Sequence, residues 1–317
     1  MAKIAILDDY QNVSLSMADW SGLAASHSIQ VFTTPFASAT AAAQAVAPFD
    51  IVCIMRERTL FDAAMFAQLP NLKLLVTSGH RNAAIDVAVA NAHGVIVSGT
   101  DAPGIATAEL SMALILGLSR NLVLEANAMR EGRWQTTVGR DLKGRTLGLI
   151  GLGRLGGQMA KYGQAFGMPV IAWSQNLTAE AATQHGATRV EKDELFRRAD
   201  VISIHTKLSP RTTGLVGKAE LALMKRDALL INTSRGPVID EAALLTALHE
   251  GRIGGAGIDV YEPEPLPANH PLRSAPRTLL TPHIGYVTEE TYRVFYGGTV
   301  AAINAWLAGK PIHVLPA

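Results

Sequence analysis

Short runs of Val, Ile and Leu recur along the first hundred residues, and alanine-rich stretches with helical spacing separate them. Runs that are apolar throughout, rather than alternating with polar residues, are typical of strands buried on both faces of a sheet. The alternation of such strands with helices predicts an α/β unit with a parallel sheet. We expect its strands at residues 3–7, 29–33, 50–54, 73–77 and 94–98.

A second series of the same kind follows and is longer than the first, so we expect the larger of two sheets there. Its predicted strands are residues 145–151, 169–173, 200–205, 228–233, 254–260 and 277–283. Residues 289–309 have helical periodicity, and no strand follows them. We therefore expect this last helix to pack on the first unit, which makes that unit discontinuous.

Residues 98–104, "SGTDAPG", interrupt the pattern with two glycines, a proline and an aspartate, which indicates a linker. A helix is predicted after it, through "IATAELSMALILGLSR" and on to Trp134. This helix is too apolar on too many sides to be solvated, so part of its surface should meet another subunit. The chain thus divides into two domains, residues 1–99 plus 287–317 and residues 100–286.

Composition narrows the class of protein. The 317 residues carry a formal net charge of +1, which gives no electrostatic reason to expect nucleic acid or an anionic membrane as a partner. The N-terminal "MAKIAILDDY" is typical of neither a signal nor a transit peptide, and the apolar stretch at residues 110–118 is about half the length of a membrane span. A single cysteine, Cys53, and the lack of any zinc-ligand spacing favour a cytoplasmic protein without a structural metal.

The stretch "LGLIGLGRLGG" places Gly151, Gly153 and Gly156 in G-x-G-x-x-G spacing, between an apolar strand and a helix that begins near Leu155. This is the context that a dinucleotide pyrophosphate requires. The glycines let the backbone approach the phosphates, and the helix N-terminus directs unpaired N–H groups at them. Residues 100–286 are therefore predicted to form a Rossmann-type, NAD(P)-binding domain. Arg154 inside the turn either contacts the pyrophosphate or is solvated.

The residue that usually binds the adenosine ribose is missing. A carboxylate is expected about 20 residues after the turn, at the end of the next strand, but Ser174, Gln175 and Asn176 stand there. No acid repels a 2′-phosphate at this place, and no arginine binds one. The residues leave NAD and NADP open, and we take NAD as the expected cofactor with NADP as the alternative.

Three polar residues follow the ends of successive predicted strands: Arg235 in "INTSRGPVID", Glu264 in "IDVYEPEP" and His283 in "TPHIG". In a doubly wound sheet these ends line the crevice where ligands bind. Arg235 is able to hold a carboxylate with its planar guanidinium. His283 is able to donate a proton to a keto oxygen as hydride arrives, and Glu264 beside it would favour the protonated imidazole.

Each of the three also has a structural interpretation. Arg235 could neutralise a helix end, Glu264 could be a solvated acid, and His283 could be a packed core residue. Their occurrence at three successive strand ends, downstream of a nucleotide-binding turn, favours catalysis instead. The sequence predicts an oxidoreductase that transfers hydride between NAD(P)H and a 2-keto acid or 2-hydroxy acid, working mainly as a 2-keto acid reductase.

From "GRTLGLIGLGRLGG" to "TPHIG", the motifs resemble those of the D-isomer-specific 2-hydroxyacid dehydrogenase family, and the resemblance covers almost the whole chain. It implies catalytic roles for Arg235, Glu264 and His283, and cofactor contacts at Thr233 and Asp259, although Asp259 taken alone could be a turn aspartate. It also implies a homodimer formed through the long helix, and a flavodoxin-like substrate domain made of residues 1–99 plus 287–317.

The substrate loop departs from that family's pattern. The family usually has two glycines and an aspartate there, whereas "TSGHRNAAID" places Ser78 and Gly79 before His80 and Arg81. Arg81 either grips a second acidic group of the substrate or faces solvent.

The segment "MRERT" places Arg56 at a position resembling the family's substrate-side arginine, with Arg58 as an alternative beside Thr59. The extra positive charge in this region favours a substrate more anionic than glyoxylate.

Two other functions compete with this prediction. A dinucleotide-sensing corepressor uses the same scaffold for partner recruitment, but it usually carries additional interaction segments. A formate dehydrogenase has the same architecture, but it has glutamine where Glu264 stands here.

Overall fold

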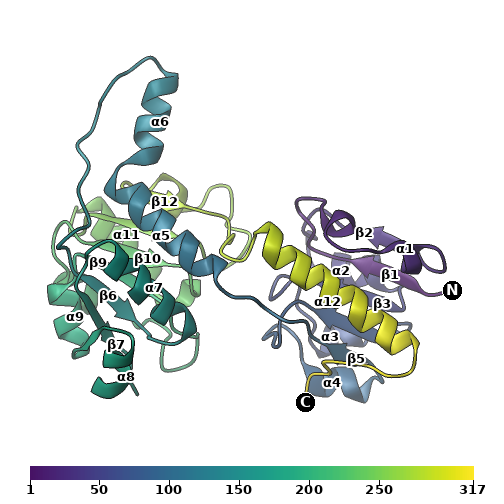
Figure 1. Ribbon diagram of the computed structural model, residues 1–317. Coiled ribbons are helices and arrows are strands. Elements are labelled where there is room, and N and C mark those ends of the chain that lie inside the picture. Colours follow the sequence, from purple (N-terminus) through teal and green to yellow (C-terminus); the bar gives the residue numbers. More distant parts are fainter. The chain divides into compact units, whose positions relative to one another are not determined.

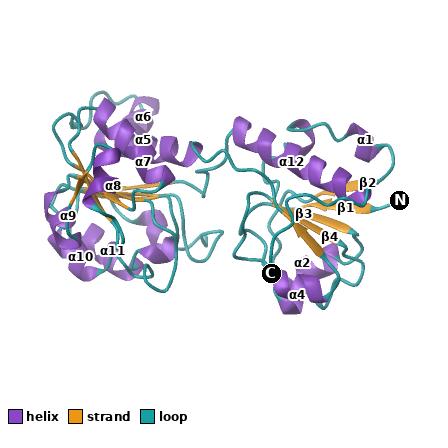
Figure 2. Ribbon diagram, turned by 60° about the horizontal axis from the view of Figure 1, so that its bottom comes forward, coloured by secondary structure: helices purple, strands orange, loops and turns teal.

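The computed structural model describes residues 1–317, which fold into two compact units. Unit 1 comprises Met1–Pro103 and Val287–Ala317, and unit 2 comprises Gly104–Tyr286. Each unit contains one parallel sheet with helices on both faces (Figures 1 and 2). The predicted α/β class is confirmed.

Unit 1 has a five-stranded sheet in the order β2-β1-β3-β4-β5. This is the strand order of flavodoxin-like folds. The strands are β1 (Lys3–Ile6), β2 (Ser28–Val31), β3 (Ile51–Ile54), β4 (Leu74–Thr77) and β5 (Ile96–Ser98). The helices are α1 (Ser21–Ala24), α2 (Ala39–Val46), α3 (Ala63–Phe66), α4 (Val87–Ala92) and α12 (Glu289–Leu307), with a 3₁₀ turn, η1, at Ser14–Ser16.

The layers of unit 1, helices on both faces of a sheet, follow from the alternation of apolar strands and helices in the sequence. Every residue of β3 and β4 is buried, because helices cover both faces of the sheet. Three of those helices begin where a short polar side chain caps them: Ser38 accepts from the N–H of Ala41, Asp62 from Met65 and Asp86 from Val89.

The C-terminal segment Val287–Ala317 belongs to unit 1. Helix α12 starts at the capping residue Thr288 and packs against β4. The tail beyond the helix returns to β5, where Val314 bridges Ser98 in antiparallel fashion and the N–H of Leu315 donates to the carbonyl of Val97. The tail thereby covers the edge of the sheet.

Unit 2 has the larger sheet, with seven strands in the order β12-β11-β10-β9-β6-β7-β8. Read from β6, this is the Rossmann order with one further strand at the end. The strands are β6 (Leu147–Ile150), β7 (Val170–Trp173), β8 (Thr188–Arg189), β9 (Val201–Ile204), β10 (Leu229–Asn232), β11 (Gly255–Ile258) and β12 (Thr278–Leu280). The helical elements are α5 (Ala106–Ser119), α6 (Leu122–Arg130), α7 (Arg154–Ala165), α8 (Ala179–Gln184), α9 (Lys192–Arg198), α10 (Lys218–Leu223), η2 (Gly236–Val238), α11 (Glu241–His249) and η3 (Pro271–Ser274).

Two sequence predictions need correction in unit 2. The edge strand β8 was missed, because its two residues are exposed and carry no apolar run. The single long helix to Trp134 is wrong: α5 ends at Ser119, and α6 follows at an angle of 62° and ends at Arg130. Asn121 takes a left-handed conformation between them, with φ of 51°, and asparagine tolerates that conformation better than most residues.

No single helix of the structure has both the length and the apolar composition needed to cross a membrane, although the bent pair α5 and α6 together meets that test.

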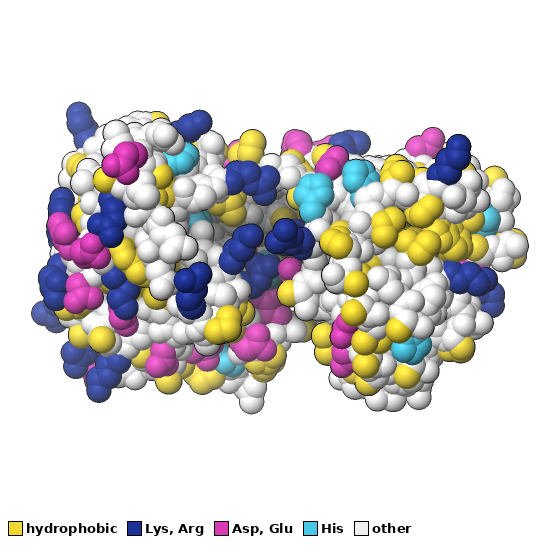
Figure 3. Space-filling view, turned by 90° about the horizontal axis from the view of Figure 1, so that it is seen from below, with side chains coloured by type: hydrophobic (Ala, Val, Ile, Leu, Met, Phe, Trp, Pro, Cys, Tyr) yellow, Lys and Arg dark blue, Asp and Glu magenta, His cyan; other side chains and the backbone are white.

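The face drawn in Figure 3 carries both basic and acidic side chains.

Candidate functional site

The strands β10, β11 and β12 are neighbours in the parallel sheet of unit 2, so their carboxyl ends meet at one edge. Adjacent strands lie about 5 Å apart, which brings the residues that follow them within side-chain reach of one another. Arg235 follows β10, Glu264 lies in the loop after β11, and His283 follows β12.

His283 and Glu264 form a direct pair. Nδ1 of His283 lies 2.6 Å from Oε2 of Glu264, and each side chain retains about a fifth of its exposure (18% and 20%). The other carboxylate oxygen, Oε1, accepts the backbone N–H of Tyr261 at 2.8 Å. The pair is thus joined through Nδ1 of His283.

Asp259 holds residues on both sides of His283. Its Oδ1 accepts the hydroxyl of Thr281 at 2.6 Å and the N–H of Ile284 at 2.8 Å, while Oδ2 accepts the N–H of Gly285 at 2.9 Å. The residue is fully buried, and this burial raises the pKa of its carboxyl. These bonds hold His283 in a left-handed conformation with φ of 53°.

Asp259 thus has a role that sequence reasoning did not foresee. The resemblance implied a contact with the carboxamide of the nicotinamide, whereas three donors of the chain already occupy the carboxylate. A carboxylate oxygen accepts about two hydrogen bonds, so Oδ2 retains one acceptor position for such a contact.

Arg235 extends from the end of β10 in an extended backbone conformation, and its Nη1 donates to the carbonyl of Ser234 at 2.7 Å. The next residue, Gly236, lies against the loop after β11: a Cβ there would come within 2.6 Å of the backbone of Tyr261. The loops that carry Arg235 and Glu264 therefore pack directly on each other.

The glycine turn has the shape that a dinucleotide requires. Gly151 has φ of +92°, and a Cβ there would lie 2.5 Å from the carbonyl oxygen of His205. A Cβ on Gly156 would lie 2.1 Å from the carbonyl oxygen of Gly151, whereas nothing stands within 4 Å of one on Gly153. The turn is closed on its inner side and open at Gly153, where the 12-residue helix α7 begins and presents its N–H groups.

Arg154 and Leu155 open that helix. A Cβ on Gly104 would fall within 2.4 Å of Cζ and of both Nη atoms of Arg154, so the guanidinium lies across Gly104. Leu155 packs beside the apolar cluster beneath the turn.

The other predicted cofactor residues lie at neighbouring strand ends. Ser174 is half-buried and Gln175 is exposed, both just after β7. Thr233, just after β10, is buried, and its hydroxyl lies 2.7 Å from that of Ser111 on α5. No carboxylate stands between Trp173 and Glu180, and Glu180 belongs to the first turn of α8.

His205 was not singled out from the sequence, yet it lies beneath the glycine turn. Its Nε2 is 2.8 Å from the hydroxyl of Ser203, and its buried Nδ1 has no hydrogen-bond partner. Burial lowers the pKa of His205 to about 4, so the ring is neutral in the folded protein at neutral pH. An unpartnered buried nitrogen next to the turn is consistent with a polar ligand there.

This burial makes a prediction for stability. The unfolded chain protonates His205 near pH 6.5, but the folded protein does so only near pH 4, so the unfolded state binds more protons between these values. The group should therefore lower the free energy of unfolding by about 3 kcal/mol as pH falls from 7 to 4. Urea denaturation of the wild type and His205→Gln at several pH values measures this, and the variant should lose less stability in acid. Parallel curves would contradict the assignment.

In unit 1 the predicted substrate residues gather at the carboxyl end of the sheet. The hydroxyl of Ser78, after β4, accepts the N–H of Arg56, after β3, at 3.0 Å. Gly79 has φ of +85°, and a Cβ there would lie 2.7 Å from Nη1 of Arg56, so that guanidinium lies over Gly79. The N–H of Gly79 donates to the hydroxyl of Thr100 at 2.8 Å.

His80 and Arg81 form the exposed tip of the same loop. His80 lies 3.6 Å from the carboxylate of Asp101. Asn82 anchors the loop behind them, because its amide donates to the hydroxyl of Thr77 at 2.9 Å and to the carbonyl of Arg56 at 2.5 Å. Sequence reasoning missed Asn82, because it directly follows the polar residues His80 and Arg81 and nothing in the sequence distinguishes it from them.

Arg58, the alternative to Arg56, lies near an acid of unit 1. The carboxyl of Asp8 is bonded to the hydroxyl of Thr59 at 3.1 Å, and Arg58 attracts it electrostatically. Burial outweighs these effects and raises the pKa of Asp8 to about 6.

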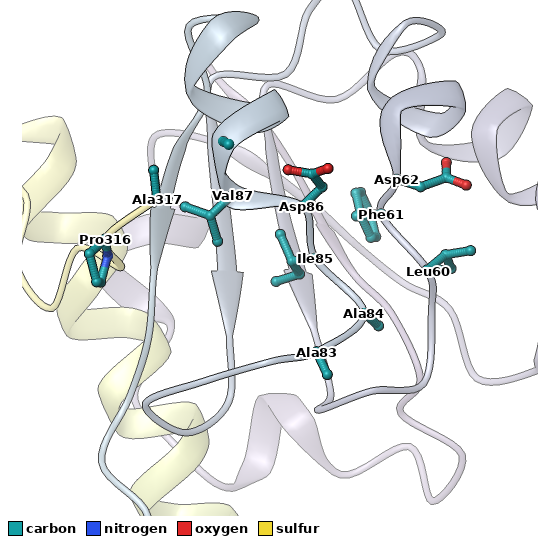
Figure 4. A pocket seen from close by; sticks show the side chains of 11 residues that line it. Leu60, Phe61, Asp62, Ala83, Ala84, Ile85, Asp86, Val87, Pro316 and Ala317 are labelled. Atoms are coloured by element: carbon teal, nitrogen blue, oxygen red, sulfur yellow. The ribbon is translucent and has the colours of Figure 1, made fainter. Parts of the chain in front are cut away.

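A separate pocket in unit 1 lies beside the C-terminal tail (Figure 4). Small and apolar side chains provide most of its lining, among them Ile85 and Val87. Its two acids, Asp62 and Asp86, are already engaged as helix caps. The pocket therefore offers few polar groups for chemistry, in contrast to the strand ends.

In unit 2 the Rossmann strand order, the glycine turn, the imidazole–carboxylate pair and an arginine after a neighbouring strand are together typical of an NAD(P)-dependent dehydrogenase. Comparison with known proteins supports this class. The sequence profile of the family described as "D-isomer specific 2-hydroxyacid dehydrogenase, NAD binding domain" matches residues 112–285. The chain therefore belongs to the D-isomer specific 2-hydroxyacid dehydrogenase family. It is an oxidoreductase that transfers hydride between NAD(P)H and 2-keto or 2-hydroxy acids.

Individual relatives are similar over most of the chain. A glyoxylate reductase of Thermococcus litoralis is 41% identical over 244 residues, which are 72% of this chain and 72% of the relative. A glyoxylate reductase of Aeropyrum pernix is 38% identical over 242 residues, 73% of this chain and 72% of the relative. The crystal structure of a phosphoglycerate oxidoreductase from Vibrio cholerae has a TM-score of 0.92 at 36% identity and covers 98% of this chain and 100% of that one.

Proposed function

We propose that the protein reduces 2-keto acids to 2-hydroxy acids, with Arg235, Glu264 and His283 as its catalytic residues. The observation that carries this proposal is the 2.6 Å contact between Nδ1 of His283 and Glu264 at the strand ends of unit 2. We also propose that residues 100–286 form the NAD(P)-binding domain, and that residues 1–99 plus 287–317 form the substrate domain.

Arg235 binds the carboxylate of the substrate in this proposal. A guanidinium makes two parallel hydrogen bonds to a carboxylate, which fixes the orientation of the neighbouring keto carbon. Gly236 packs on the backbone of Tyr261, so the loop that carries Arg235 is held against the loop that carries Glu264. Orientation of this kind lowers the barrier of a transfer between two bound groups.

His283 supplies the proton. When bound, the cofactor supplies the hydride to the keto carbon, and the oxygen of that carbonyl gains negative charge. His283 donates its Nε2 proton to this oxygen, and in the oxidative direction the neutral ring takes the proton back. Glu264 holds Nδ1, so it fixes the orientation of the ring and stabilises the imidazolium.

The cofactor is proposed to bind along the strand ends of unit 2. Gly151, Gly153 and Gly156 let the backbone approach the pyrophosphate, with Arg154 and Leu155 at the start of α7. The adenosine ribose is assigned to Ser174 and Gln175, and the nicotinamide to Thr233 and Asp259. Residues 174–176 provide neither an acid that repels a 2′-phosphate nor an arginine that binds one, so these residues do not decide between the two cofactors. We take NADH as the expected cofactor and NADPH as the alternative.

Unit 1 is proposed to recognise the substrate through Arg56, Ser78, Gly79, His80 and Arg81. Glyoxylate reductases are among the similar proteins, and glyoxylate is therefore one candidate. The cationic side chains at positions 56 and 81 favour a 2-keto acid that is more anionic than glyoxylate.

Cofactor and substrate are tested in one experiment. The absorbance of NADH and of NADPH is followed with glyoxylate, hydroxypyruvate, pyruvate, 2-ketoglutarate and phosphohydroxypyruvate. We expect oxidation of NADH by at least one of these acids, and its product should be the D-isomer where it is chiral. If no 2-keto acid in the panel oxidises either cofactor, the proposed function is wrong.

We propose further that two copies of the chain associate through α6. This helix extends away from the sheet of unit 2 (Figure 1) and exposes a row of apolar side chains. Leu122, Val123, Leu124 and Met129 are each at least half exposed, and Trp134 beyond the helix is 72% exposed. Such a contiguous apolar surface is typical of an interface.

Sedimentation velocity tests the association. The wild type is expected to sediment as a dimer, and Leu124→Glu is expected to shift it towards the monomer, because a charge is desolvated in the interface. Leu15→Glu is the control, since Leu15 is also more than half exposed (51%, against 60% for Leu124) but lies in unit 1. A monomeric wild type would contradict the proposal.

A further inference from the structure

Tyr261 makes hydrogen bonds near both members of the Glu264–His283 pair. Its phenol donates to the carbonyl oxygen of Thr281 at 2.9 Å, and the backbone N–H of His283 donates to that same oxygen at 3.0 Å. Its own backbone N–H donates to Oε1 of Glu264 at 2.8 Å. Tyr261 thus bonds both to the carboxylate of Glu264 and to the Thr281 carbonyl that accepts the backbone N–H of His283.

The phenol also links two strands. It lies 2.8 Å from the carbonyl oxygen of Ile258, the last residue of β11, in addition to its bond to Thr281 just after β12. A phenol has one hydrogen, which is shared between these two acceptors. Because Glu264 follows β11 and His283 follows β12, this link joins the two segments that carry the pair, next to the backbone bond from the N–H of Thr281 to the carbonyl of Ile258 at 2.9 Å.

Two further observations indicate that the link made by the Tyr261 phenol is stable. Tyr261 is only 7% exposed, and burial together with the nearby carboxylates of Asp259 and Glu264 raises the pKa of its phenol. The phenol therefore stays a neutral donor throughout the pH range of an assay. Gly236 packs on its backbone from the other side, where a Cβ would lie within 2.6 Å, so Tyr261 has little room to shift.

We propose that Tyr261 is a positioning residue of the reaction, whose phenol holds His283 at the distance and angle from Glu264 that proton transfer requires. The proposal rests on the proposed role of His283 as the proton donor. Tyr261 itself touches neither substrate nor cofactor in this account. It acts by aligning the imidazole, and small misalignments of catalytic groups are costly.

The test replaces Tyr261 by Phe, which removes the phenol oxygen but keeps the ring and the backbone N–H. We expect kcat for the best 2-keto acid to fall roughly 10- to 100-fold, with the KM of the acid and the Kd of NADH changed less than about threefold. The matched control is Tyr292→Phe. Tyr292 is a buried tyrosine of unit 1 whose phenol donates to Gln11 at 3.0 Å, so its loss removes a comparable hydrogen bond away from the pair.

A purely structural role would give a different result. In that case both variants would lose thermal stability but keep the kcat of the wild type below their melting temperatures, and the proposal would be overturned. An unchanged kcat in Tyr261→Phe would overturn it whatever the change in stability.

A second measurement does not depend on turnover. The proton shared between Nδ1 of His283 and Glu264 should give a far-downfield ¹H NMR signal in the wild type and in Tyr292→Phe, identified by its loss in His283→Asn. We expect this signal to shift or broaden in Tyr261→Phe. If it is identical in Tyr261→Phe, the positioning role is wrong even where the enzyme reduces 2-keto acids. If the wild type reduces none, the signal still tests the geometry separately from the proposed function.

Discussion

Replacing His283 by Asn is expected to lower kcat for 2-keto acid reduction by about 10²- to 10⁴-fold, the range that a positioned acid contributes. The amide cannot donate an acidic proton to the oxygen that gains charge as hydride arrives. The Kd of NADH should stay within a few-fold of the wild-type value, because the glycine turn at residues 151–156 is untouched. Stopped-flow absorbance and a fluorescence titration measure the two quantities.

A matched control for this variant lies in the same unit. His270 also pairs with a carboxylate, because its Nε2 lies 3.2 Å from Glu241. It is the N-terminal capping residue of η3, however, and does not follow the end of a strand. His270→Asn should turn over at close to the wild-type rate. If the His283 variant does the same, His283 is not the proton donor.

Replacing Arg235 by Lys is expected to lower kcat/KM by about 100-fold and to raise the KM of the keto acid. Lysine keeps the charge but cannot make two parallel hydrogen bonds, and the loss of one charge-assisted bond costs about 1.5 to 3 kcal/mol. Both parameters should change, because the substrate is bound less tightly and also oriented less well. Steady-state kinetics with the best substrate of the panel resolve the two effects.

The control for this substitution is Arg252→Lys, which changes an exposed arginine paired with Glu250 on the surface of unit 2. It should leave both parameters unchanged, since exposed ion pairs contribute little. A KM and kcat of Arg235→Lys equal to those of the wild type would exclude a bidentate contact with the substrate.

Much of the fold could be predicted because the strands are buried on both faces. Parallel strands under two layers of helices need mostly apolar residues, and β3, β4, β9 and β10 are buried along their whole length and largely apolar. The exposed edge strand β8 has no such requirement and left no pattern. The break between α5 and α6 was missed for a different reason: it depends on the single backbone conformation of Asn121, inside a run of apolar residues.

The candidate site was predictable where the type of a residue indicates its chemistry. An arginine, an acid and a histidine after successive strands are visible in a sequence. The contacts of Asp259 are not, because its three donors include two backbone N–H groups that the sequence does not mark. The contacts of Tyr261 are hidden in the same way, since its phenol bonds only to carbonyl oxygens.

A double-mutant cycle of Glu264→Gln and His283→Asn, measured as kcat/KM for the best 2-keto acid, tests the central claim most directly. Each single variant removes one member of the pair joined by the 2.6 Å contact, so each should lower kcat/KM. The double variant should lose little more than His283→Asn alone, because Glu264 acts through the imidazole. Losses that simply multiply in the double variant would contradict the claim that this carboxylate and this imidazole act as a pair.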